Sequence, residues 1–98
     1  MTSKQVPPPG GIINEPHLKK PVPVHVQRPD RRETLKLNVP LGMSQDNFVR
    51  LVADHLRFSQ NQMYVTFQGS QLSGPASLWD AGIREGDTVQ THLRLRGG

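Results

Sequence analysis

Two hydrophobic periodicities meet within residues 35–57, LKLNVPLGMSQDNFVRLVADHLR. In the first part apolar residues alternate with polar ones, at Leu35, Leu37 and Val39. Alternation of this kind is the pattern of a strand with one buried face. A proline and a glycine at positions 40 and 42 then end it, because neither continues a regular strand.

The second part of the same stretch predicts a helix. Ser44 can cap its first turn, and Asp46 carries a negative charge where the helix dipole favours one. The apolar residues that follow are Phe48, Leu51, Val52 and Leu56. Their spacing of i, i+3, i+4 and i+8 predicts an amphipathic helix over residues 45–57, with the Arg57 cation in its last turn.

A second alternating segment precedes this stretch. Val22, Val24 and Val26 alternate with Pro23 and polar residues, and the sequence RPDRR at 28–32 contains a Pro-Asp turn signal. Two strands joined by such a loop form an antiparallel hairpin. Pro23 has no N–H to donate, so we expect the first strand to begin at or just after it, or to lie at a sheet edge.

Two further strands follow the helix. Met63, Val65 and Phe67 alternate in one of them, and residues 88–93 form the other. Between them, Ser77–Gly82 has the composition of a single capped helical turn. The order of elements predicts an α+β fold in which a small mixed sheet wraps on one helix.

Composition excludes several classes of function. The chain has 98 residues and no cysteine, which excludes a disulfide scaffold, a cysteine zinc site and a cysteine nucleophile. Four histidines show no shared spacing for a metal, and no Ser-His-Asp set stands out, so we expect no enzyme, no metal and no cofactor. The net charge of +4 is mild and spread along the chain, so nucleic acid is not an expected partner.

The first 21 residues differ in composition from the rest. They hold five of the nine prolines and few residues that could be buried, so we expect a flexible arm over residues 1–21. No apolar run reaches the roughly 18 residues that a membrane span needs. We therefore expect a monomer of the cytoplasm or nucleus without a membrane partner.

The chain ends with residues 93–98, LRLRGG, and this segment resembles the mature tail of ubiquitin. The resemblance runs without a gap from Leu35 to Gly98 and includes the motif Phe67-x-Gly69-x-Gln71-Leu72. It implies the β-grasp (ubiquitin-like) fold over residues 22–92, followed by a flexible conjugation tail over residues 93–98. The arm that precedes this domain is similar to the tails of SUMO-type modifiers.

The resemblance implies that the chain is a protein tag. Gly98 would be joined to an amine of a target protein after ATP-dependent activation, and Gly97 would give clearance in a narrow enzyme channel. The residues that would position the tail are Leu93, Arg94, Leu95 and Arg96. The implied partners are activating, conjugating and ligating enzymes, a deconjugating protease and the target proteins.

The sequence also departs from ubiquitin. The positions of ubiquitin's apolar recognition patch align with Thr66, Gln90 and His92, so receptors of that patch should bind poorly. Trp79 aligns with a polar position and either anchors a partner or packs over the Ser77 turn. We treat these four residues as a candidate partner surface.

Chain formation would need a lysine of the tag itself. The chain has four lysines, and we expect the branch points at Lys4, Lys19 and Lys20, in the arm, rather than at Lys36 on a strand. Two other functions remain open. The chain could be a non-conjugated ubiquitin-like interaction domain of a larger protein, or a sulfur carrier that ends in a thiocarboxylate.

Overall fold

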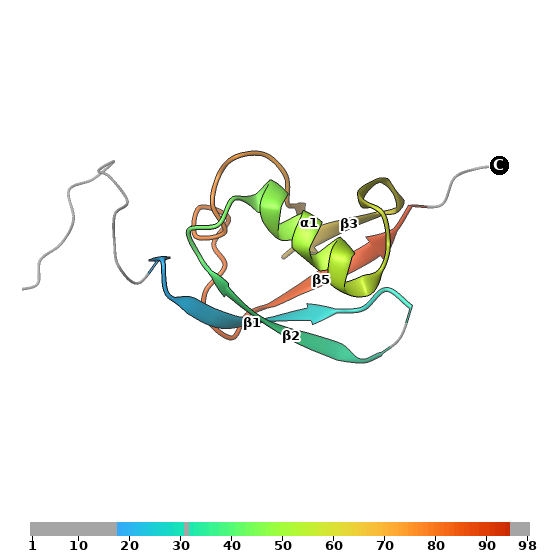
Figure 1. The fold of residues 1–98 in the computed structure, drawn as a ribbon, viewed down its shortest axis with the longest axis horizontal. Helices are drawn as coiled ribbons and strands as arrows, with labels where there is room; N and C mark the ends of the chain where they lie inside the picture. The colour runs from blue at the N-terminus through green and yellow to red at the C-terminus, as the bar shows by residue number, and fades with distance from the viewer. Residues whose placement is uncertain (1–17, 31, 95–98) are drawn as a thin grey trace, which may run out of the picture.

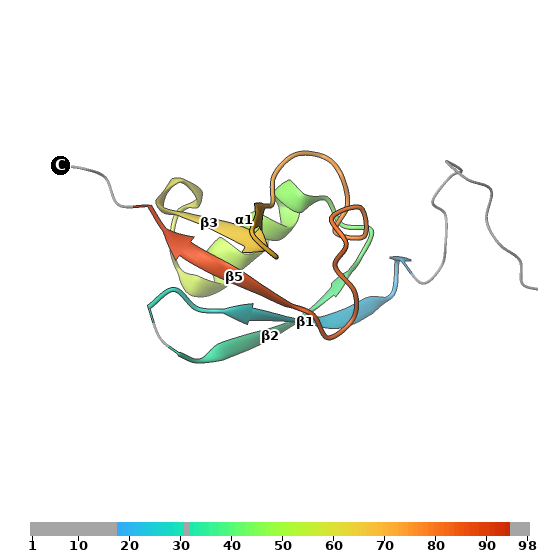
Figure 2. The same ribbon diagram turned by 180° about the vertical axis from the view of Figure 1, so that it is seen from behind.

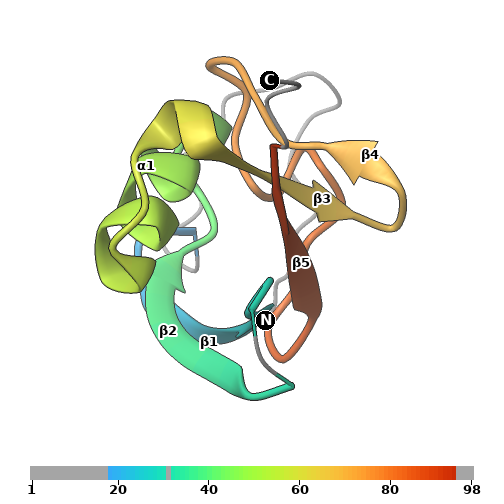
Figure 3. The same cartoon turned by 90° about the vertical axis from the view of Figure 1, so that its right-hand side faces the viewer.

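The computed structural model describes residues 18–30 and 32–94. The elements, in chain order, are β1 (Pro21–Gln27), β2 (Thr34–Pro40), α1 (Gln45–Leu56), a short 3-10 helix (Gln60–Gln62), β3 (Met63–Phe67), β4 (Ser70–Gln71) and β5 (Thr88–Leu93). Figure 1 shows α1 lying across the strands, and Figure 3 shows the sheet curling around it.

The strands form one mixed sheet in the order β2-β1-β5-β3-β4. β1 and β2 make the predicted antiparallel hairpin, with Val24 opposite Leu37. β5 pairs in parallel with β1 and antiparallel with β3, so it joins the two halves of the chain. The predicted α+β fold, a mixed sheet wrapped on one helix, is confirmed.

One face of the sheet and one face of α1 form the core. Phe48 and Val52 of α1 are fully buried. The strand residues with no exposed surface are Val24, Val26, Val65 and Val89. These valines come from three adjacent strands and all lie on the side of the sheet that faces the helix, which is the period-two pattern expected from the sequence. Leu72, Leu78 and Ile83 close the core from the segment between β3 and β5.

The two ends of α1 differ in how closely they follow the prediction. The Ser44 side chain accepts a hydrogen bond from the Asn47 N–H at 3.1 Å, as a capping serine should. At the other end the helix stops at Leu56, one residue earlier than predicted. Arg57 adopts a left-handed conformation with a φ of 66° and acts as the C-cap residue, its N–H bonding to the carbonyls of Ala53 and Asp54.

Pro23 lies inside β1, which begins at Pro21 and sits between two other strands. The expectation that the strand would begin at Pro23 or lie at an edge is therefore wrong. The reason is the direction of the backbone. The backbone N–H of His25, two residues on, points towards the β5 side of the strand, where it donates to the Asp87 carbonyl. An N–H at Pro23 would point to the same side. Because β5 pairs with β1 only from His25 onwards, the sheet loses no strand-to-strand hydrogen bond at Pro23.

The ordered domain begins earlier than the expected boundary at residue 22. Leu18 is only 3% exposed and belongs to the core. Its carbonyl accepts the Gly42 N–H at 2.9 Å, and a Cβ at Gly42 would come within 3.0 Å of that carbonyl oxygen. Residues 18–21 are thus part of the domain and not of an arm, because one leucine and one backbone hydrogen bond attach them to it. The rest of the expected arm, residues 1–17, lies outside the described residues.

We predict that Leu18→Ala lowers the free energy of unfolding by about 2–4 kcal/mol, because it removes a buried side chain from a small core. Urea unfolding followed by the fluorescence of the single tryptophan measures this change. Lys20→Ala, at an exposed position two residues away, is the matched control and should leave the midpoint unchanged. Equal midpoints for Leu18→Ala and the parent chain would show that Leu18 does not contribute to the core.

Candidate functional site

The outer face of the sheet, opposite α1, gathers three of the four residues predicted as a partner surface. Thr66 of β3 lies directly across from Gln90 of β5, and the next outward pair is Tyr64 with His92. Burial of Val65, Val89 and other inward residues forces these neighbours outward, since side chains alternate along a strand. Figure 2 shows this side of the molecule, with β5 in front of the helix.

Specific contacts fix the imidazole of His92. Its Nε2 and the Thr66 hydroxyl are hydrogen-bonded at 2.9 Å. Its ring stacks on Tyr64, with the ring centroids 4.8 Å apart and the planes 19° from parallel. The Arg94 guanidinium lies 5.1 Å from the centre of the same tyrosine ring. These contacts hold an imidazole and a guanidinium against one aromatic ring.

Tyr64 was missing from the predicted surface. The sequence could have identified it. Tyr64 lies between Met63 and Val65, which are buried, and side chains alternate along a strand, so Tyr64 must point outward. The antiparallel register with β5, which places Tyr64 beside His92, is set by tertiary pairing. Alternation alone does not give that register.

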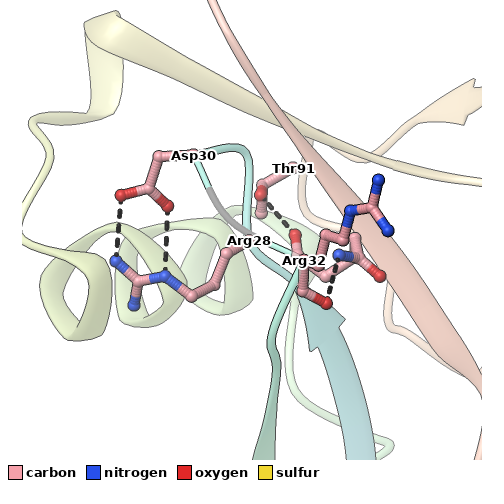
Figure 4. Close-up of polar contacts among 5 residues, drawn as sticks. Arg28, Asp30, Arg32 and Thr91 are labelled. Carbon is pink, nitrogen blue, oxygen red and sulfur yellow. Dashed lines mark hydrogen bonds and ion pairs between the residues drawn. The ribbon is translucent and has the colours of Figure 1, made fainter.

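The loop between β1 and β2 is anchored beside this face. Arg28 pairs with Asp30 through two hydrogen bonds of 3.1 and 3.2 Å. The Gln27 side chain donates to the Arg32 carbonyl at 3.1 Å, and the Thr91 hydroxyl donates to the Gln27 carbonyl (Figure 4). Two charges of this loop are thus paired with each other, and β5 holds Gln27, the residue that precedes the loop.

Trp79 lies apart from the other three residues, in the segment between β4 and β5. Its N–H donates to the Leu41 carbonyl at 2.9 Å, and its side chain packs on the core. The Arg84 guanidinium stacks on the indole, 3.3 Å from the ring centre, and donates to the Trp79 and Ile83 carbonyls. Two roles were considered for Trp79: packing within the domain and anchoring a partner. This environment favours the first role.

The turn around Trp79 follows the predicted capping pattern. The Ser77 N–H donates to the Asp80 carboxylate at 3.2 Å, and the Asp80 N–H donates to the Ser77 hydroxyl at 3.0 Å. Gly82 ends the turn with a φ of 94°, a conformation that favours glycine. Trp79 is therefore held by its backbone as well as by Arg84.

The beginning of the predicted tail still belongs to the sheet. Leu93 is the last residue of β5, pairs with Met63 and is 39% exposed. Arg94 follows it and donates its N–H to the Gln62 carbonyl at 2.8 Å. The remaining predicted tail residues, including the reacting Gly98, lie outside the described residues.

The predicted branch-point lysines fall into two groups. Lys19 and Lys20 are exposed and lie between the buried Leu18 and the first residue of β1. They therefore project from the folded domain and not from a flexible arm. Lys4 lies outside the described residues, and Lys36 is exposed on β2, as predicted.

The described part of the chain shows neither a metal-binding cluster nor a membrane-spanning helix. No group of three or more histidine, aspartate or glutamate residues within 18–30 and 32–94 is arranged to hold a metal ion. None of the helices described there has the length and apolar character to cross a membrane.

Comparison with known proteins shows the fold. Neither a protein-family model nor a curated protein matches the sequence. Among 419 matching chains of solved structures is the UBL domain of Dsk2 from Plasmodium falciparum, with a TM-score of 0.68 and 15% identity. The match covers 76% of this chain and 99% of the Dsk2 domain. The chain therefore has the ubiquitin-like fold.

We predict that Arg84→Ala exposes the indole of Trp79. Loss of the stacked guanidinium should shift the tryptophan emission to longer wavelength, increase quenching by acrylamide and lower stability by about 0.5–2 kcal/mol. Arg50→Ala removes the same charge from the exposed surface of α1 and should leave the emission unchanged. If emission and quenching do not change in Arg84→Ala, the guanidinium does not cover the ring in solution.

Proposed function

We propose that this chain is a ubiquitin-like protein tag, attached to amines of target proteins through the carboxylate of Gly98. The observation that supports this most is the LRLRGG sequence of residues 93–98, which begins at the last residue of the final strand of a ubiquitin-like fold. Arg94 is still hydrogen-bonded to the domain. The four residues after it could extend at most about 14 Å, enough for a carboxylate to enter a narrow channel while the domain stays outside.

The chemistry needs no catalytic group of this chain. The Gly98 carboxylate would attack the α-phosphate of ATP, form an acyl-adenylate and release pyrophosphate. An enzyme thiol would then displace AMP to give a thioester, and a target amine would displace the thiol to give an amide. Gly97 and Gly98 have no side chains to obstruct these exchanges, and Leu93, Arg94, Leu95 and Arg96 would position the tail.

The proposal implies a set of partners and a location. Activating, conjugating and ligating enzymes would transfer the tag, and a deconjugating protease would remove it. Transfer of this kind requires ATP and free enzyme thiols, which fits the cytoplasm or nucleus. The tag would act as a monomer, because its tail must reach one enzyme site at a time.

A second candidate is a non-conjugated interaction domain of a larger protein. The matched structure favours it, since the ubiquitin-like unit there is one domain of Dsk2. Native coding sequence that continues past Gly98 and is never removed would support this candidate. A sulfur carrier is a third candidate. Intact mass after activation would identify it, because a thiocarboxylate replaces one oxygen with sulfur.

Incubation with ATP and the cognate activating and conjugating enzymes should give an enzyme adduct that reducing agent removes. Deletion of Gly98 should abolish the adduct, because it removes the carboxylate that is activated. An unchanged circular dichroism spectrum would show that the deletion leaves the fold intact. An adduct that survives this deletion would exclude conjugation through Gly98.

If the tag forms polymers, replacement of Lys4, Lys19 and Lys20 together by arginine should abolish them. Arginine keeps the charge, but its guanidinium stays protonated and cannot act as the attacking amine. Single attachment through Gly98 should persist in this variant. Lys36→Arg is the matched control and should leave the polymers intact. Polymers that persist in the triple variant would place the branch point at Lys36 or at the amino terminus.

A further inference from the structure

A hollow lies where α1, β3 and the end of β5 meet. It is lined by Arg50 of α1, Tyr64 of β3 and Arg94 after β5, together with Asp46, Gln71 and Ser73. In Figure 3, α1 lies to the left of β3 and β5. Folding thus brings Arg50 and Arg94, which are far apart in the sequence, to the same hollow.

Neither arginine is paired with a carboxylate within the described ranges. Arg50 donates to the Asn47 amide oxygen at 3.3 Å, and the Arg94 guanidinium lies over Tyr64. Asp46 also lines the hollow, but its carboxylate accepts the Gly74 N–H at 2.8 Å and stabilises the neighbouring loop. The hollow therefore has an excess of positive charge and two guanidinium groups with donors to spare.

The sheet face next to the hollow has the same character. None of the five strands contains an aspartate or a glutamate. Gln27, Gln90, Thr66 and Gln71 lie in register across four strands and form a row of amide and hydroxyl groups. His92 lies beside this row, stacked on Tyr64. A partner that crosses this face would meet hydrogen-bonding groups and cations but no fixed negative charge from the strands.

We propose that this surface binds a short acidic segment of a partner protein. Two nearby carboxylates of the segment would occupy the hollow, one on Arg50 and one on Arg94, because the guanidinium fork matches the geometry of a carboxylate. The rest of the segment would lie along the row that contains Gln90 and Thr66, which offers donors and acceptors to an extended backbone.

Charge and ring contacts favour an acidic protein segment over a nucleic acid. Phosphate backbones are held by lines of several cations, whereas this surface has two arginines and one histidine at one end of an uncharged row. Single strands also need exposed aromatic rings for base stacking. The Tyr64 ring already contacts both His92 and Arg94.

This binding goes beyond the proposed tagging function and does not depend on it. It uses the folded surface and no glycine of the tail, so a conjugated tag and a non-conjugated domain would both have it. Failure of thioester formation and failure of peptide binding are therefore separate results.

The test uses the full chain and a fluorescein-labelled peptide of eight glutamates. Fluorescence anisotropy should show salt-sensitive binding, and the amide signals of Arg50, Tyr64, His92 and Arg94 should move in an NMR titration. The double variant Arg50→Gln and Arg94→Gln should weaken binding about ten-fold, as expected when two exposed charge contacts are lost. Charge reversal to glutamate at both positions should instead create binding to a peptide of eight lysines.

Lys20→Gln is the matched control, because it removes an exposed charge beside the first residue of β1, outside the hollow. It should leave the affinity for the glutamate peptide unchanged. Amide dispersion of each variant shows whether it is folded. The proposal is wrong if the glutamate peptide does not bind, if it binds equally to the double variant, or if a single-stranded oligouridylate binds more tightly.

Discussion

The alternation of side chains along the strands links the core of this domain to its outer surface. The valines of β1, β3 and β5 must meet Phe48 and Val52 of α1 to form a core. Each residue that satisfies this requirement sends its neighbours to the opposite face. The outer face, with its polar groups and its stacked Tyr64 and His92, is therefore determined by the same packing that stabilises the fold.

Parts of the structure that depend on local pattern could be predicted from the sequence. The hairpin, the helix with its Ser44 cap and the turn at Ser77 each follow from spacing and capping within a few residues. The errors concern longer-range contacts. Leu18 resembled part of a polar arm, and only its packing against the core shows otherwise. Pro23 could not be placed without knowing where β5 begins.

The candidate site shows the same division. The resemblance to ubiquitin pointed to Thr66, Gln90 and His92 as a candidate partner surface. The pairing of β3 with β5 brings them together on one face of the sheet. The hollow could not be predicted, because Arg50 and Arg94 are brought together by the packing of α1 against the sheet and by the position of β5. The environment of Trp79 also depends on the stacked side chain of Arg84, five residues away.

The parallel pairing of β1 with β5 has a mechanical consequence. β1 begins at one end of the domain, and β5 leads out of it towards the tail. A pulling force applied between these two points would run along both strands in opposite directions. The hydrogen bonds between them, from His25 to Gln27 and from Thr88 to Gln90, would be loaded together in shear and not opened one by one. A domain with this connection resists extension along the line from the beginning of β1 to the end of β5.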